Sequence, residues 1–217
     1  MKNFNNEEHW DNNYWTRYLE SNKDKNKLDF MHDVWIEKYR KILNKIEKGK
    51  ALDLGCGIGQ DTMFLINEGY DVLSTDISEK ALNELKKKVH NAKILKLDMN
   101  KLLPFNNEEF NLVFANLSTH YYNWNDTVQL YNEIRRILKK DGYFIGRVNS
   151  TKTFKSNEED LTLIENNFYF GRRYFRLFNE EDFDQLFKDW NIIILNETTT
   201  NRWGKKKTLW EFIVKKN

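Results

Sequence analysis

The stretch ALDLGCGIGQDTMFLINEGYDVLSTDIS, residues 51–78, decides the fold of this chain. Its apolar start, 51–54, predicts a buried parallel strand. The glycines within 55–59 predict a tight turn, and 61–68 predicts a helix that a following glycine ends. A second strand is predicted over 70–75, with an acid directly after it. Strand, glycine turn, helix and acid-terminated strand together form a nucleotide-binding βαβ unit.

The spacing of glycines and acids within this unit narrows the range of possible ligands. The sequence separation between Asp53 and Asp76 is close to ~20 residues. In nucleotide-binding units an acid at this separation hydrogen-bonds a ribose hydroxyl. The dinucleotide fingerprint G-x-G-x-x-G, however, would place its third glycine where Gln60 stands. The third glycine comes one residue early, at Gly59. The pattern therefore departs from the one that holds a pyrophosphate at a helix N-terminus.

The stretch resembles motif I of the class I S-adenosylmethionine (SAM) dependent methyltransferases, hydrophobic-x-D-x-G-x-G-x-G. The resemblance covers residues 30–149 well, and within the family the chain looks most like small bacterial enzymes of the tellurite-resistance and general small-molecule type. It implies an α/β fold: a doubly wound, mostly parallel seven-stranded sheet with an antiparallel C-terminal hairpin and helices on both faces. The alternative is a glycine turn in an unrelated α/β protein.

The remaining elements follow from periodicity and turn residues, and no linker divides the chain, so one domain over 1–217 is expected. Helices are predicted over 5–20, 33–48, 126–139, after the N-cap Ser78 and after the N-cap Asn179. Strands are predicted over 92–97, 110–115, 143–148, 190–198 and 207–215, with loops or turns at 21–27, 141–142 and 202–206.

Two segments fall outside the regular alternation. In many members of the family an N-terminal piece like residues 1–48 folds over the cofactor as a lid; alternatively its aromatic side chains only cap the core. Residues 150–178 are polar and then aromatic and basic. Placed after the fifth strand, they are expected to lie over the acceptor side of the crevice.

The resemblance implies SAM as cofactor and S-adenosylhomocysteine as product. It assigns Asp76 to the ribose and Asp98 to the adenine amino group, with Met99 packing on the ring. The alternative for Asp98 is a solvated acid at a strand end. The full set of expected cofactor-binding residues is Asp53, Gly55, Cys56, Gly57, Gly59, Asp76, Ile77, Asp98, Met99, Asn116 and Leu117.

Residues 116–122 leave the carboxyl end of the predicted fourth strand, where ligands of open parallel sheets bind. His120 is the candidate general base, since an imidazole exchanges protons near neutral pH. The alternative is a pocket-lining histidine. The expected acceptor-binding residues are Tyr14, Tyr121, Tyr122, Arg147, Asn149, Tyr169 and Arg172.

Composition excludes several classes of protein. The 217 residues are 40% hydrophobic and carry a net charge of only +2, which argues against general binding to nucleic acid or anionic membranes. A single cysteine excludes an internal disulfide and a multi-cysteine zinc site, so no metal is expected. No apolar run approaches ~20 residues and the N-terminus lacks a signal-peptide pattern, so a cytoplasmic monomer or homodimer is expected.

The acceptor class is narrowed by what is missing. Methylation of an exocyclic base amine usually uses Asn/Asp-Pro-Pro-aromatic after strand four, where this chain reads Asn116-Leu117-Ser118-Thr119. Cytosine C5 methylation usually needs Pro-Cys, and the one cysteine is Cys56 in the glycine turn. A small-molecule acceptor, methylated at O, N or S, is the prediction. The basic–aromatic stretch could also be core with a solvated face, or stack on RNA.

Two other functions stay open. An NAD(P)-binding Rossmann oxidoreductase would share the βαβ unit, although Gln60 and the closing hairpin speak against it. A non-catalytic module that senses SAM would share every expected cofactor contact. Methyl transfer has no obligatory catalytic residue, so the sequence does not separate an enzyme from a sensor.

Overall fold

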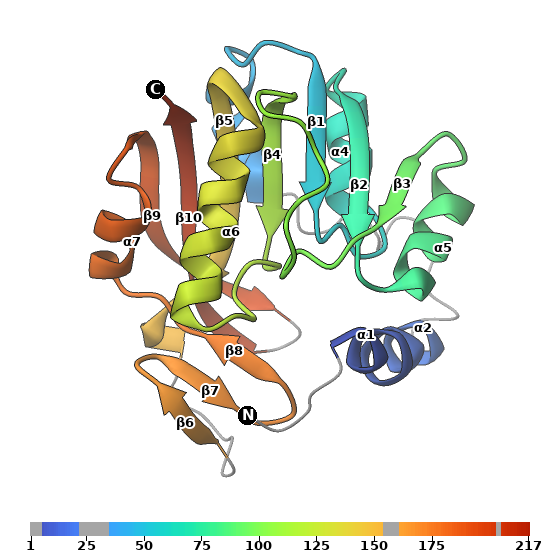
Figure 1. Ribbon diagram of the computed structural model, residues 1–217. Coiled ribbons are helices and arrows are strands. Elements are labelled where there is room, and N and C mark those ends of the chain that lie inside the picture. The colour runs from blue at the N-terminus through green and yellow to red at the C-terminus, as the bar shows by residue number, and fades with distance from the viewer. Residues whose placement is uncertain (1–5, 22–34, 154–160, 203–204) are drawn as a thin grey trace. The chain divides into compact units, whose positions relative to one another are not determined.

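The computed structural model describes residues 6–21, 35–153, 161–202 and 205–217. Seven strands form one sheet in the order β3-β2-β1-β4-β5-β10-β9 (Figure 1). The pairs β1–β2, β2–β3 and β4–β5 are parallel, whereas β10 is antiparallel to both β5 and β9. Their bounds are β1 Lys50–Leu54, β2 Asp71–Asp76, β3 Lys93–Lys96, β4 Phe110–Asn116, β5 Leu138–Asn149, β9 Trp190–Arg202 and β10 Lys205–Lys216. The predicted α/β fold with an antiparallel closing hairpin is confirmed.

The chain divides into two compact units, an amino-terminal unit (1–99) and a carboxy-terminal unit (100–217). The helices of the amino-terminal unit are α1 Asn6–Glu8, the π-helix η1 His9–Trp15, α2 Thr16–Ser21, the 3-10 helix η3 Trp35–Tyr39, α3 Arg40–Leu43, α4 Gln60–Asn67 and α5 Glu79–Lys88. The prediction of a single domain is not tested by this division and stays a prediction.

Helix α5 begins after Ser78, as the sequence predicts, and α4 begins at Gln60, one residue before its predicted start. Gly59 takes a left-handed conformation and is the N-cap of α4, and Gly69 takes the same conformation after its end. Ser78 is the N-cap of α5, because its hydroxyl accepts a hydrogen bond from the Ala81 amide. The apolar face of α5 is buried with Cys56 and Ala92 in one hydrophobic cluster.

The carboxy-terminal unit adds α6 Trp124–Ile137, the 3-10 helix η4 Thr151–Thr153 and α7 Glu180–Leu186. In Figure 1, α6 lies across the face of β5, and a second, three-stranded sheet lies beyond the carboxyl end of β4. That small sheet has the order β6-β7-β8, with bounds β6 Thr162–Glu165, β7 Phe168–Phe170 and β8 Tyr174–Arg176. It is antiparallel and lies within the predicted insertion, where no strands were predicted.

Several predicted boundaries are wrong. The helix predicted to end at residue 48 ends at Leu43, because the amides of Lys45 and Ile46 donate to carbonyls three residues back and tighten the chain into a turn. The helix predicted to end at 139 ends at Ile137, and the turn predicted at 141–142 lies inside β5. Asp141 there has a positive φ of 65°.

The helix predicted over 5–20 is present, but its middle is π-helical. Most of the loop predicted over 21–27, the first residues of the helix predicted at 33, and part of the turn predicted over 202–206 lie outside the described residues. Among the described residues, no helix is both long enough and apolar enough to cross a membrane.

Candidate functional site

The glycine turn after β1 is built by three left-handed residues. Gly55, Gly57 and Gly59 have φ values of 78°, 54° and 89°, which side chains other than glycine rarely adopt. Space is restricted as well: a Cβ on Gly59 would lie 2.1 Å from Cδ1 of Leu85, and one on Gly57 would lie 2.8 Å from the Trp15 ring. Glycine is required at 57 and 59 both by the left-handed conformation and by the close approach of Trp15 and Leu85.

Four backbone amides of this turn, those of Gly55, Cys56, Gly57 and Gly59, donate hydrogen bonds within the protein. The amides of Gly55 and Cys56 both donate to the Thr75 carbonyl at 2.8 Å, and the Gly59 amide donates to the Cys56 carbonyl at 3.0 Å. The Gly57 amide donates to Asp76 Oδ2 at 2.8 Å. Since an N–H group has one proton to donate, these amides have none left for a phosphate.

Asp76 ends β2 and is fixed on both sides. Its Oδ2 accepts from Gly57, and its Oδ1 accepts from the Ser78 amide at 2.9 Å. The residue is only 9% exposed. Burial raises the pKa of Asp76 to about 6, against the effect of hydrogen bonds from the amides of Ser78, Gly57 and Ile77, and the carboxylate of Asp11 adds to the rise. Each carboxylate oxygen keeps a lone pair that can accept from a ligand hydroxyl.

Asp53 lies below the turn and is nearly fully buried. The Thr62 hydroxyl donates to its Oδ2 at 2.6 Å and lies 2.8 Å from the Ser74 hydroxyl. Burial, and secondly the charge of Asp61, raise the pKa of Asp53 well above its ordinary value. These contacts tie β1 to α4 and β2, so the structure gives Asp53 a local structural role. Its predicted contact with a cofactor stays a prediction.

Cys56, the remaining side chain predicted in the turn, is buried. Its Sγ lies 3.5 Å from the Gly57 carbonyl oxygen. Burial raises the pKa of the thiol well above its ordinary value, with the charge of Asp53 adding to the effect. The residue therefore packs in the turn as a small apolar side chain, and burial disfavours its thiolate form.

The N-terminal helices contact the start of α5 through Asp11. Its carboxylate accepts a short hydrogen bond from the Ser78 hydroxyl and a 3.3 Å bond from the Lys80 amide. The Lys80 ammonium in turn donates to Thr16 Oγ1 at 2.7 Å. Asp11 of η1 thus accepts hydrogen bonds at the N-terminus of α5, where the helix dipole favours a negative charge.

The aromatic side chains of η1 form an edge-to-face series. Tyr14, predicted to bind the acceptor, has its ring centroid 4.9 Å from that of Trp15 and 5.0 Å from that of Trp10. Trp15 is the member that approaches Gly57. The sequence indicated an amphipathic helix here but did not single out Asp11 or Trp15.

The other predicted cofactor residues of this unit lie at the same edge of its strands. The amide of Leu97 donates to the Asp76 carbonyl at 2.9 Å, so that Asp98 and Met99 follow β3 beside the end of β2. Asp98 and Ile77 are half-buried, and Met99 is buried. The structure therefore brings Asp76, Asp98 and Met99 to one edge, as predicted.

In the carboxy-terminal unit, the end of β4 is held by Arg147. The Arg147 Nε donates to Asn116 Oδ1 at 2.9 Å, and the Leu117 amide donates to the Arg147 carbonyl at 2.9 Å. Leu117 has a positive φ of 57°, a strained conformation of the kind that clusters at functional sites. Arg147 is 1% exposed and stands opposite Glu211 across the β5–β10 ladder. The position of Arg147 supports a role in holding Asn116. The predicted contact of Arg147 with the acceptor stays a prediction.

His120 and its neighbours form the segment between β4 and α6. The His120 ring is buried, with its centroid 4.2 Å from that of Tyr121. The guanidinium of Arg173 lies 5.6 Å from the Tyr121 centroid, within cation–π range. Tyr122 is buried. The structure thus places His120 against Tyr121; the predicted roles of His120, Tyr121 and Tyr122 stay predictions.

The other residues predicted to bind the acceptor lie on β5 and on the small sheet. The Asn149 carbonyl accepts from the Phe178 amide at 2.8 Å. Tyr169 is stacked on Phe175 across β7 and β8, with a centroid distance of 5.7 Å. Arg172 lies between these two strands and is exposed. None of these placements tests a contact with an acceptor.

Comparison with known proteins identifies the domain. Residues 52–146 match a family model described as a methyltransferase domain. A solved structure of SAM-dependent methyltransferases from Methanosarcina mazei superposes with a TM-score of 0.71 at 17% identity, covering 82% of this chain and 97% of that one. Over these residues the chain is similar to a methyltransferase domain, and its fold is the one that class I methyltransferases share.

Among curated proteins, YqeM of Bacillus subtilis (strain 168), itself named only as a candidate methyltransferase, is 29% identical over 135 residues, 56% of this chain and 55% of that protein. The mitochondrial arginine-hydroxylase NDUFAF5 of Mus musculus is 35% identical over 117 residues, 53% of this chain and 33% of that protein. The chain thus spans from a third to about half of these relatives. The matched domain and the solved neighbour support an enzyme and SAM as its cofactor.

Proposed function

We propose that the protein is an enzyme that transfers the methyl group of SAM to an oxygen, nitrogen or sulfur atom of a small molecule. The proposal keeps the cytoplasmic location and the monomeric or homodimeric state expected from the sequence. It is supported chiefly by one observation: four amides of the glycine turn already donate hydrogen bonds within the protein, one of them to Asp76.

Charge around the turn favours a cationic ligand over a phosphate. The negative charge of Asp61 acts on the turn, since it raises the pKa of both Asp53 and Cys56. Asp61 also lies in the first turn of α4, the helix end at which a dinucleotide fold would hold its pyrophosphate. SAM carries a positive sulfonium and no phosphate. The same features count against the NAD(P) alternative.

The residues present fit this cofactor. Asp76 offers anchored carboxylate oxygens to the ribose hydroxyls. Gly57 and Gly59 take the left-handed conformations that shape the turn beside Asp76. Asp98 and Met99 stand at the neighbouring strand end as the adenine contacts that the family resemblance implies.

The chemistry requires little of the protein beyond positioning. When bound, SAM supplies a methyl group on a sulfonium, and S-adenosylhomocysteine leaves as a neutral thioether. The acceptor heteroatom attacks in line with that bond, and aligning the reactants can contribute about 7–11 kcal/mol. A base is needed only if the acceptor must lose a proton. His120 is our candidate for that step.

The cofactor is tested by thermal unfolding with SAM, S-adenosylhomocysteine, NADH and NADPH in parallel. A ligand at ~100 times its Kd stabilises by about 2.7 kcal/mol, which raises the Tm of a domain of this size by roughly 5–10 °C. We expect a rise with SAM and S-adenosylhomocysteine only. A rise restricted to the nicotinamide cofactors would replace the proposal with an oxidoreductase.

The acceptor class is tested by following a radiolabelled methyl group from SAM into panels of small phenols, amines and thiols, arginine peptides and RNA. The peptides are included because NDUFAF5 is named for arginine. Label in a small molecule supports the proposal. Label in peptide or RNA alone would overturn the small-molecule assignment, and SAM binding without transfer to any panel would favour a sensor.

A further inference from the structure

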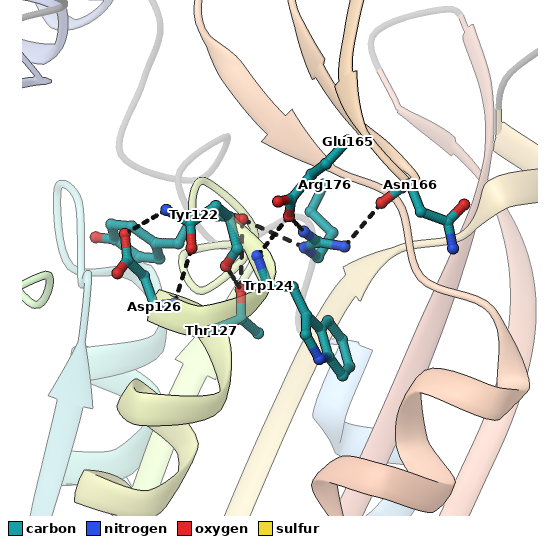
Figure 2. Close-up of polar contacts among 8 residues, drawn as sticks. Tyr122, Trp124, Asp126, Thr127, Glu165, Asn166 and Arg176 are labelled. Carbon is teal, nitrogen blue, oxygen red and sulfur yellow. Dashed lines mark hydrogen bonds and ion pairs between the residues drawn. The ribbon is translucent and has the colours of Figure 1, made fainter. Parts of the chain in front are cut away.

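Arg176, at the end of β8, is the most enclosed charge in the inserted small sheet. Its side chain is 2% exposed. The guanidinium donates through Nε to the Tyr122 carbonyl at 3.3 Å and through Nη1 to the Asn166 carbonyl at 3.0 Å. Figure 2 shows this side chain between the segment that follows β4 and the turn that follows β6. One arginine thus joins two stretches that are far apart in sequence.

Glu165 extends the same link. Its Oε1 accepts a short charge-assisted bond from Arg176 Nη2 and a 2.6 Å bond from the Trp124 amide, the first residue of α6 (Figure 2). A carboxylate at this amide also suits the positive end of the helix. Glu165 therefore couples the start of α6 to β6, with Arg176 as its partner.

Aromatic rings and the backbone complete the enclosure. The guanidinium carbon lies 5.2 Å from the Trp124 centroid and 5.4 Å from the Phe168 centroid, both in cation–π range. The backbone amide of Arg176 donates to the His120 carbonyl at 2.7 Å. Residues 120–124 are consequently held from both the main chain and the side chain of position 176.

We propose that Arg176 is a positioning residue that fixes residues 120–124, and with them His120 and Tyr121, against the small sheet for acceptor binding. The link to the acceptor rests on the methyltransferase function proposed above. Burial lowers the pKa of Arg176 from its ordinary value, with the charge of Glu165 opposing the change. The planar fork serves several acceptors at once, which a lysine ammonium cannot do in the same geometry.

The chain offers a matched arginine for comparison. Arg136, on α6, donates to the carbonyls of Leu103 at 3.0 Å and Phe105 at 2.8 Å and pairs with Glu133 at 2.8 Å. It thus ties a loop in the way that Arg176 does, but the loop precedes β4, whereas the acceptor segment follows it. Its loss should loosen the fold without displacing residues 120–124.

Hydrogen–deuterium exchange of the full-length protein tests the positioning role without an acceptor. In Arg176→Lys and Glu165→Ala, we expect amides in 120–127 and 162–168 to exchange about 10-fold faster or more, since each loses hydrogen bonds that close this segment. Arg136→Lys should speed exchange in 101–107 and leave 120–127 unchanged. Glu165 is 40% exposed, so its variant keeps the test valid if the Arg176 variant unfolds.

Kinetics with an acceptor found in the small-molecule panel tests the functional part. Arg176→Lys should raise the KM for that acceptor about 10-fold, while the Kd for SAM stays within about 2-fold. Unchanged exchange in 120–127 for both variants would overturn the inference. So would a KM increase of equal size in Arg136→Lys. Failure of the wild type to bind SAM would instead remove the proposed function and leave the exchange result standing.

Discussion

The amide of Gly57 donates a 2.8 Å hydrogen bond to Oδ2 of Asp76, so the glycine turn after β1 orients the acid at the end of β2. The glycine turn and Asp76 are therefore held together, although α4 and most of β2 lie between them in the sequence. This relationship links the conformation of the glycine turn to the orientation of the carboxylate expected to bind ribose. The predictions below follow from it and from its surroundings.

Asp76→Asn should weaken SAM binding about 10- to 100-fold, because an amide replaces a charged acceptor and its NH2 group faces the donors of Gly57 or Ser78. Isothermal titration calorimetry measures the change. Asp71→Asn is the matched control: Asp71 begins the same strand, is exposed and pairs with Lys93. Equal affinities for Asp76→Asn and wild type would remove Asp76 from the ribose contact.

The affinity for SAM should depend on pH through Asp76, whose pKa is raised by burial to about 6. The ionised carboxylate is the better acceptor, so the Kd should rise up to tenfold per unit as the pH falls below about 6. Asp76→Asn should flatten this dependence. Asp11→Asn should move its midpoint to lower pH, because Asp11 contributes to the raised pKa of Asp76.

The free energy of unfolding should depend on pH in the opposite direction from the affinity for SAM. With its pKa raised on folding, Asp76 holds a proton in the folded state that it has already lost in the unfolded state. The free energy of unfolding should therefore fall by about 3 kcal/mol in total as the pH rises from well below 4 to well above 6, with about 2 kcal/mol of this between pH 4 and pH 6. The difference between urea unfolding of wild type and Asp76→Asn isolates this contribution. A difference that does not vary with pH would contradict the raised pKa.

Gly59→Ala should destabilise the fold by about 3 kcal/mol or more, since the added Cβ meets Leu85 and the positive φ is strained as well. Gly69→Ala is the control, because Gly69 has nearly the same φ of 88° with no atom within 4 Å of a Cβ. It should cost only about 1 kcal/mol. Equal losses in urea unfolding would show that contact with Leu85 adds nothing.

His120→Asn should lower kcat by about 100-fold or more if His120 is the base, because general-base catalysis contributes about 10²–10⁴ in rate. The Kd for SAM should change little. The measurement is single-turnover kinetics with the acceptor found in the panel, and a shallow pH–rate profile should replace that of the wild type. If turnover holds while affinity falls, His120 only lines its pocket.

The sequence predicted the elements of the fold better than their ends. Local signals such as the Ser78 N-cap and the Asn179 N-cap were sufficient, and both hydrogen bonds are present. Helix ends such as Ile137 depend on strand pairing, since Leu138 joins the β4–β5 ladder. The apolar pattern continues through this junction, so periodicity alone predicted a longer helix.

The site was predicted where one short stretch carries it. Gly57 and Asp76, both predicted to bind the cofactor, lie within one βαβ unit, and the structure adds a hydrogen bond between them that was not predicted. Contacts over long sequence separations could not be predicted in the same way. Asp11 is one of several acids in a polar helix, and Arg176 is one of several arginines in the insertion. Only strand alternation in 174–176, which places Tyr174 and Arg176 on one face, could have signalled its burial.

The contacts of Asp11 with Ser78 and Lys80 have a practical consequence for fragment design. The matched domain starts at residue 52, and a fragment cut to those bounds would leave the beginning of α5 to water and Gly57 without Trp15 above it. Ligand affinities measured on such a fragment would describe a different surface from that of the whole chain. Expression should therefore retain the residues from η1 onward.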